Sequence, residues 1–219
     1  MARERKHPPS AACLSASMRD LGYSLETAIA DLVDNSISAG ASAVEVICDL
    51  SGKDPVVAIL DDGRGMTGDE LLDAMRHGTL NPRERRSATD LGRFGLGLKT
   101  ASFSQCRSLT VASATPHGTV ASEWNLDRID EADEWLLSVY DEADIRALPY
   151  IERLDATGTL VLWRLLDRLA ARNVRSLEGF FLQAPSFHDR TSRLSQSDRR
   201  ESGGYLSCSC AEVIRKRSS

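Results

Sequence analysis

Asp31 and Asn35 have the residue types and the spacing for chemistry on a bound water. They lie four positions apart in ETAIADLVDNSISAGA, a stretch whose apolar residues recur at helical spacing. Side chains at positions i and i+4 of a helix point into the same space. A carboxylate beside an amide oxygen can polarise a water and bind a hard cation such as Mg²⁺. The alternative interpretation is the solvent-facing polar stripe that most amphipathic helices carry.

A second motif places carboxylates at the end of an apolar run. The stretch ILDDGRGM covers residues 59–66, and Asp61 is its first aspartate. A carboxylate at the end of a buried strand accepts a hydrogen bond from an exocyclic amine such as that of adenine, and it disfavours a carbonyl at that position. The glycines beyond it leave room for a flat ring. The alternative is a turn with two solvated aspartates.

A third motif is the glycine cluster of LGRFGLGLKTAS, with Gly92, Gly95 and Gly97 inside six positions. Glycines that open a helix let backbone amides approach a phosphate. The spacing differs from a Walker A loop because Leu98 separates the last glycine from Lys99. It also reverses the Rossmann order, and no apolar strand precedes it. The alternative is a tightly packed turn from loop to helix.

The elements that must position these motifs follow from apolar periodicity and turn residues. Ser24 is a plausible N-cap and Gly40 a plausible stop for the first helix. Helices are expected at 24–39, 67–76 (capped by Thr67) and from Gly95 to about Phe103, and strands at 43–50, 55–62, 107–114, 118–126, 134–140 and 157–164. Short turns between consecutive strands favour antiparallel pairing. We therefore expect an α+β, two-layer α/β sandwich.

Composition limits the class of protein. The chain has 219 residues, 42% of them hydrophobic, and a formal net charge of −5. One substantial domain is expected, and the net charge gives no support to nucleic-acid binding, although arginines cluster locally. Five scattered cysteines frame no disulfide scaffold. No stretch resembles a signal peptide or a membrane span, so a cytoplasmic protein without a membrane partner is expected.

The chain divides into three predicted parts. Residues 1–12 are expected to be a flexible lead, and residues 13–184 a single domain that contains a polar, arginine-rich loop at 77–94. Residues 185–219 are rich in serine and arginine without periodicity, and we expect them to be disordered.

In order and spacing, the three motifs resemble the GHKL superfamily of ATP-binding domains. That superfamily includes gyrase B subunits, MutL-type mismatch-repair proteins, heat-shock chaperones, histidine kinases and Morc-type ATPases. The resemblance covers roughly residues 20–165 and is closest to Morc-like or stand-alone bacterial-style ATPases, because of SISAGA and the Lys99 that follows GLGL. It implies a Bergerat-type sandwich with a mixed, mostly antiparallel sheet and helices on one face. It also implies ATP and Mg²⁺ as cofactors, with loop 77–94 as a lid over the triphosphate.

The resemblance further implies a set of site residues. Asp31 matches the catalytic base, Asn35 the Mg²⁺ ligand and Asp61 the residue that binds the adenine amine. Thr159 matches a strand-borne threonine beside the adenine. The other positions that match ATP-binding residues are Gly63, Gly65, Met66, Gly92, Gly95, Leu96, Gly97 and Lys99.

One position departs from the family pattern. The usual water-activating glutamate is Asp31 here, and the loss of one methylene can cost ~10²-fold in rate. We therefore expect Mg·ATP binding, slow hydrolysis and a lid-driven conformational switch. Two alternatives remain: a non-hydrolysing, ATP-gated interaction module, and a histidine-kinase-like phosphotransfer domain. The second is disfavoured because Pro8 and Pro9 follow His7, which excludes a phosphoacceptor helix there.

The expected partners, besides ATP, are a second copy of the chain or an additional protein domain. In gyrase and MutL relatives a second domain supplies a lysine to the γ-phosphate. The composition after residue 185 does not fit such a domain, so the chain resembles an isolated or truncated ATP-binding module.

Overall fold

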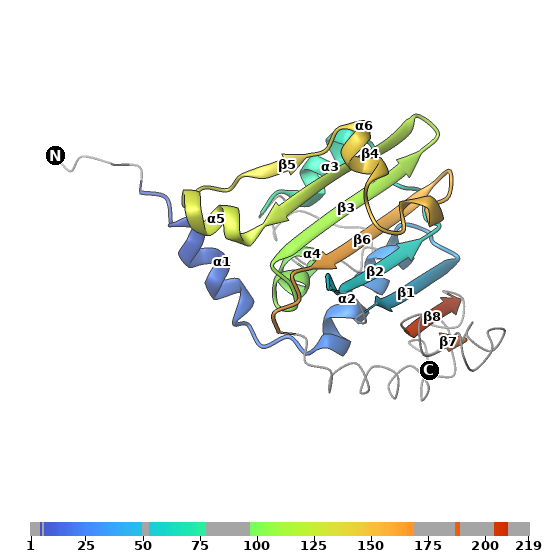
Figure 1. The fold of residues 1–219 in the computed structure, drawn as a ribbon, viewed down its shortest axis with the longest axis horizontal. Helices are drawn as coiled ribbons and strands as arrows, with labels where there is room; N and C mark the ends of the chain where they lie inside the picture. The colour runs from blue at the N-terminus through green and yellow to red at the C-terminus, as the bar shows by residue number, and fades with distance from the viewer. Residues whose placement is uncertain are drawn as a thin grey trace, which may run out of the picture.

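An antiparallel sheet forms the centre of the molecule (Figure 1). The computed structural model describes residue 5, residues 7–49, 53–77 and 97–168, and the backbone of 187–188 and 204–209. Among the described residues, two short strands from the segment 187–209 extend one edge of this sheet, and its six main strands have the order β5-β4-β3-β6-β2-β1. They are β1 (Ala43–Asp49), β2 (Val56–Asp61), β3 (Ser108–Thr115), β4 (Gly118–Asn125), β5 (Leu137–Val139) and β6 (Gly158–Arg164). The α+β prediction is confirmed, and every pairing among the described strands is antiparallel.

The order of the strands decides which motifs meet. Strand β2 lies between β1, its neighbour in sequence, and β6, which follows about one hundred positions later. In this register Asp61 at the end of β2 pairs with Thr159 near the start of β6. The sheet therefore brings the DDGRGM motif and the threonine strand to one edge.

The predicted helices are present, and Ser24 and Thr67 cap α2 and α3 as expected. Within the described part of the chain, four further helical segments were not predicted, since each is short and lacks a sustained apolar period. The helices are α1 (Ala11–Arg19), α2 (Leu25–Ser38), α3 (Gly68–Met75), α4 (Gly97–Phe103), α5 (Leu126–Ala132), α6 (Glu142–Arg146) and the 3₁₀ turn η1 (Ile151–Arg153).

Helix α2 positions Asp31 and Asn35 because its apolar and polar residues lie on opposite faces. Its apolar residues Leu25, Ile29, Leu32 and Val33 are buried against the sheet and the neighbouring helices. This burial leaves Asp31 and Asn35 on the partly exposed side of the same helix.

Two hydrophobic clusters cover the two faces of the sheet. The larger one lies between the sheet and helices α1 to α5, which agrees with the expected helical layer. The smaller cluster lies on the opposite face, where α6 and the segment up to Leu154 cover Ala58, Leu60 and Leu162. The opposite face is thus covered as well, by a short segment that the apolar periodicity did not reveal.

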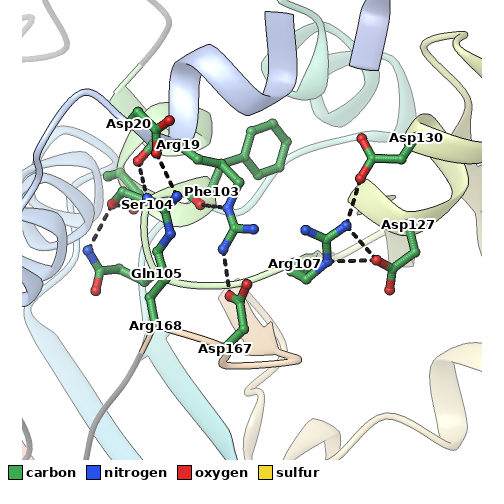
Figure 2. A network of polar contacts seen from close by, with 11 residues as sticks. Arg19, Asp20, Phe103, Ser104, Gln105, Arg107, Asp127, Asp130, Asp167 and Arg168 are labelled. Carbon is green, nitrogen blue, oxygen red and sulfur yellow. Dashed lines mark hydrogen bonds and ion pairs between the residues drawn. The ribbon is translucent and has the colours of Figure 1, made fainter. Parts of the chain in front are cut away.

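Helix α1 is held in place by contacts that are distant in sequence. It begins at Ala11, just inside the segment expected to be a flexible lead. Ser10 caps it and donates a hydrogen bond to Asp133 at 2.6 Å, and Figure 1 shows α1 beside α5. At its other end, Arg19 donates to the carbonyl of Phe103 at 3.0 Å and pairs with Asp167 (Figure 2). A helix of this length depends on such tertiary contacts.

The few described residues of the segment 185–219, for which no regular structure was expected, form two strands. The backbone of β8 (Gly204–Ser209) pairs with β1, and β7 (Phe187–His188) pairs with β8. The edge of β1 that faces away from β2 has N–H and C=O groups that need partners, and the backbone of β8 supplies them.

Candidate functional site

The carboxylate of Asp61 lies at the centre of a hydrogen-bond network at the end of β2. Its Oδ1 accepts from the N–H of Gly63 at 3.0 Å and from the N–H of Thr159 at 3.2 Å. Its Oδ2 accepts from the hydroxyl of Ser36 at 2.8 Å. Burial raises the pKa of Asp61 above its ordinary value. The three hydrogen bonds act in the opposite direction and offset this rise only in part. The carboxylate is fixed in one orientation by donors from α2, β6 and the turn after β2.

One acceptor position on Asp61 is left over. A carboxylate has about four lone-pair positions, and the described residues fill three of them. An amino group on a flat ring fits such a position, because it donates a hydrogen bond and the carboxylate oxygen can only accept one. The residues therefore fit the exocyclic amine of adenine.

Ser36 is a residue of the candidate site that sequence reasoning missed. It lies on the buried face of α2 with 4% of its surface exposed, in line with Ile29, Leu32 and Val33. The sequence feature that could have revealed this contact is a serine that interrupts the apolar face of a helix. Its hydroxyl is the contact that ties α2 to the adenine-type site.

The hydroxyl groups of Ser113 and Thr159 lie beside the turn that follows β2, and Ser113 stabilises that turn. Ser113 accepts from the N–H of Met66 at 2.8 Å and donates to the carbonyl of Gly158 at 2.9 Å. Its oxygen also lies 3.2 Å from the hydroxyl of Thr159. Met66 and Thr159, both predicted site residues, thus each contact Ser113 on β3, a residue that its sequence context did not mark.

Gly65 is required by the close approach of two chain segments. It has a φ of +69°, and a Cβ there would lie 1.9 Å from the carbonyl oxygen of Ala114. Gly158 faces Asp61 in the same way, since its Cβ would lie 2.1 Å from that residue's carbonyl oxygen. Only glycine fits at these two positions, so part of the DDGRGM motif serves the fold.

The neighbouring aspartate has a different role. Asp62 is exposed and accepts from the N–H groups of Ser42 at 2.7 Å and Ala43 at 2.8 Å. Partial burial raises its pKa, but the hydrogen bond from the Ser42 hydroxyl, together with those from the two N–H groups, outweighs burial and lowers the pKa below its ordinary value. Asp62 fastens β2 to the start of β1.

Asp31 and Asn35 lie on α2 where it packs beside α4. Oδ2 of Asp31 lies 3.8 Å from the place where a Cβ on Gly97 would stand. The structure therefore brings the candidate base to the first residue of α4. Among the described residues no cluster of three His, Cys, Asp or Glu side chains can hold a metal ion. A cation at Asn35 would take its remaining ligands from phosphate and water, as Mg²⁺ commonly does.

The side chain of Lys99 is buried and bonds backbone carbonyls of another helix. It is 1% exposed, and its ammonium donates to the carbonyl of Ala74 at 2.6 Å and of Arg76 at 2.8 Å. Burial lowers the pKa of Lys99 to about 8. The ammonium thus ties α4 to the end of α3, and contact with a phosphate remains a prediction.

His77 follows α3 and packs into an aromatic cluster. Its ring centroid lies 4.2 Å from that of Trp135, 5.3 Å from Trp124 and 5.8 Å from Phe103. Neither ring nitrogen has a hydrogen-bond partner within the described part of the chain. Burial, together with the charge of Lys99, lowers the pKa of His77 to about 4. The first residue of the expected lid loop is therefore a half-buried, neutral imidazole.

Several predicted site residues lie outside the described residues. They are Gly92, Gly95 and Leu96, together with all of the expected lid after His77. None of the described helices is long and apolar enough to cross a membrane.

Comparison with known proteins gives a family match over the region that holds the site. The family described as "Histidine kinase-, DNA gyrase B-, and HSP90-like ATPase" matches residues 23–159, which is more than half of the chain. The matched region extends from Tyr23, just before α2, to Thr159 in β6.

Individual relatives are similar over shorter stretches. The DNA mismatch repair protein MutL of Halobacterium salinarum is 45% identical over 62 residues, which is 28% of this chain and 9% of the relative. MutL of Koribacter versatilis is 37% identical over 97 residues, 42% of this chain and 15% of the relative. MutL of Shewanella baltica is 34% identical over 106 residues, 48% of this chain and 17% of the relative. The aligned part of the chain thus spans less than a fifth of the length of these relatives.

Proposed function

This chain belongs to the histidine kinase-, DNA gyrase B- and HSP90-like ATPase family, and on that premise we propose that it binds ATP with Mg²⁺ and hydrolyses it slowly. The observation that supports the proposal most strongly is the Asp61 carboxylate, fixed by donors from three elements with one acceptor position left over. Adenine would donate its amino group to that position.

The proposal gives each part of α2 a role toward the triphosphate. Asn35 would supply an amide oxygen to Mg²⁺, and the cation would offset the negative charge of the phosphates. Asp31 would accept a proton from the attacking water as general base. Backbone amides of Gly92, Gly95 and Gly97 would donate to phosphate oxygens, with Leu96 between them.

Slow turnover is expected from the length of the base. An aspartate places its carboxylate about one methylene short of the glutamate position that is usual in the family, and small displacements of a base reduce the rate strongly. ATP would therefore remain unhydrolysed for longer, and the lid would stay closed over it during that time.

A titration with a fluorescent ATP analogue tests the proposal. We expect Mg²⁺-dependent binding that unlabelled ATP reverses and GTP does not, because guanine carries a carbonyl where adenine carries its amine. Equal displacement by GTP would contradict the role of Asp61. Phosphate release is measured on the same samples, and saturable binding without phosphate release would identify an ATP-gated module in place of an ATPase.

Lid closure is tested separately by limited proteolysis. Residues 78–94, which contain Arg83, Arg85 and Arg86, lie outside the described residues. We expect trypsin to cleave there more slowly when a non-hydrolysable ATP analogue and Mg²⁺ are present. Identical cleavage rates with and without nucleotide would contradict a lid at this position.

A further inference from the structure

We propose that the cavity between the end of α4 and the start of α2 binds a small zwitterion of the α-amino acid class. Its volume of about 370 Å³ falls at the lower end of the range for small-ligand sites. Residues from the end of α1, the loop to α2, the first turn of α2 and the segments that follow α4 and β6 border it. The cavity lies at the opposite end of α4 from Gly97, the residue beside Asp31. It is therefore separate from the candidate ATP site, and the inference goes beyond the proposed function.

Gln105 places a hydrogen-bond acceptor in the cavity wall. Only 5% of its surface is exposed, and its Nε2 donates to the carbonyl of Tyr23 at 3.1 Å and to the hydroxyl of Ser104 at 2.8 Å. The Tyr23 carbonyl can only accept, which identifies the nitrogen as the amide atom that faces it. Within the described part of the chain, Oε1 of Gln105 accepts no hydrogen bond, and Figure 2 shows it turned away from Ser104.

This oxygen can be reached by a ligand. Among the described residues, the unpartnered side-chain atoms that are sealed from solvent belong to His77 and Arg164, so Oε1 of Gln105 is not sealed. Because Gln105 borders the cavity, Oε1 is accessible from that space. A nearly buried carbonyl oxygen is stabilised by a hydrogen-bond donor. The preferred ligand therefore carries an N–H or O–H group.

The start of α2 offers the opposite polarity. The hydroxyl of Ser24 accepts from the N–H of Thr27, and its carbonyl accepts from the N–H of Ala28. The N–H of Leu25, the first residue of the helix, has no acceptor among the described contacts, and Leu25 borders the cavity. The first N–H groups of a helix need acceptors from outside it, and they give this end a partial positive charge. Both properties favour a carboxylate.

Arg168 adds a full positive charge to the same wall. Its Nη2 donates to the carboxylate of Asp20 at 2.6 Å, and its Nη1 donates to the carbonyl of Arg19 (Figure 2). These two bonds hold the guanidinium at the cavity and use two of its five N–H groups. The remaining N–H groups can donate to a ligand carboxylate, which is the partner that a guanidinium matches best.

The charges in the wall exclude the simpler ligand classes. Asp20 and Glu26 also border the cavity, and their carboxylates repel a phosphate, which carries up to about two negative charges. A simple anion would leave Oε1 of Gln105 without a donor, and a simple cation would meet Arg168 and the positive end of α2. A ligand with a carboxylate and an ammonium on one carbon provides both partners. That arrangement defines an α-amino acid.

The test is binding of free L-amino acids to the full chain without nucleotide. Each amino acid is titrated to about 10 mM and followed by ligand-observed NMR, and we expect at least one to bind with a Kd of about 1 mM or lower. For that amino acid, the analogue without the amino group and the analogue without the carboxyl group should each bind at least roughly ten-fold more weakly, because each loses a charge-assisted hydrogen bond. Saturating ATP with Mg²⁺ should not displace it.

Two variants locate the site. Gln105→Met keeps the approximate size of the side chain and removes Oε1, and Arg168→Gln removes the positive charge at an exposed position that should tolerate the change. Each should weaken binding of the amino acid by roughly ten-fold, the usual worth of a hydrogen bond to a charged group. Arg146→Gln is the matched control, because this exposed arginine pairs with Glu142 on α6, on the opposite face of the sheet.

Three results would overturn the inference. The first is that no amino acid binds at about 10 mM, well above the affinity expected. The second is an equal Kd for the unaltered protein and for Arg168→Gln or a folded Gln105→Met. The third is competitive displacement by ATP, which would place the amino acid in the nucleotide site. Because the probe is an amino acid and the protein carries no nucleotide, a failure of ATP binding would contradict the proposed function and leave this inference unaffected.

Discussion

The backbone N–H of Thr159 donates to Oδ1 of Asp61 across 3.2 Å, although 98 positions separate the two residues. The same oxygen accepts from Gly63, only two positions away. The candidate adenine site therefore joins a local turn to a strand from the far end of the domain. Its geometry depends on β6 lying beside β2.

Replacing Asp61 by Asn should weaken ATP binding by roughly 10²-fold while the fold stays intact. The carboxamide oxygen can still accept from Gly63 and Thr159, and the NH₂ group can donate to Ser36. That NH₂ group, however, faces the amine of adenine, so two donors meet. Asp62→Asn is the control. Asp62 is exposed, and among the described contacts its carboxylate bonds only Ser42 and Ala43, at the start of β1. Titration calorimetry on both variants measures the difference, and an unchanged Kd for Asp61→Asn would exclude this site.

Asp31→Ala should leave ATP affinity within a few-fold and lower turnover by roughly 10² to 10⁴-fold, the usual scale for removal of a general base. Asn35→Ala should instead weaken nucleotide binding in Mg²⁺ and have little effect in EDTA, because it removes a cation ligand. The two side chains lie one helical turn apart, so a folding defect would affect both variants alike. Phosphate release and binding are measured with and without Mg²⁺. Turnover in Asp31→Ala equal to that of the unaltered protein would show that this carboxylate is not the base.

Gly65→Ala should destabilise the protein far more than Gly40→Ala. Both glycines have positive φ, +69° and +78°, so each substitution carries a backbone cost of roughly 1–2 kcal/mol. Only at Gly65 would the new Cβ meet a carbonyl oxygen at 1.9 Å, whereas nothing lies within 4 Å at Gly40. Urea unfolding compares the midpoints of the two variants. Equal midpoints would mean that the turn after β2 can move away from β3.

The pH dependence of stability should carry a contribution from His77. Burial lowers its pKa to about 4 in the folded protein, so the unfolded chain binds a proton more readily below its ordinary pKa of about 6.5. The stability that depends on a neutral His77 is therefore present above pH ~6.5 and is lost as the pH falls toward about 4. His77→Phe keeps the aromatic contacts and should flatten the fall in Tm over this range. His117→Gln, at an exposed position, is the control, and parallel profiles for His77→Phe and the unaltered protein would contradict the prediction.

Much of the candidate site could be predicted from local pattern. The apolar run that ends at Asp61, the helical spacing around Asp31 and Asn35, and the capping residues Ser24 and Thr67 are all properties of short segments. Hydrophobic periodicity and capping act over one or two turns, so a sequence displays them directly. The order of the three motifs along the chain indicates the ATPase family.

Other features were decided by the tertiary structure. Ser36 and Ser113 are ordinary residues in sequence, and each contacts the candidate site through a partner on another element. Lys99 was expected at the phosphates, yet its described bonds go to the end of α3. The sequence by itself determined the strands β1 to β6, the main helices and the acidic motifs, because these follow from periodicity along the chain. Which hydroxyl or amide completes each carboxylate depends on strand order and helix packing, and those are fixed only when distant segments bury their apolar faces together.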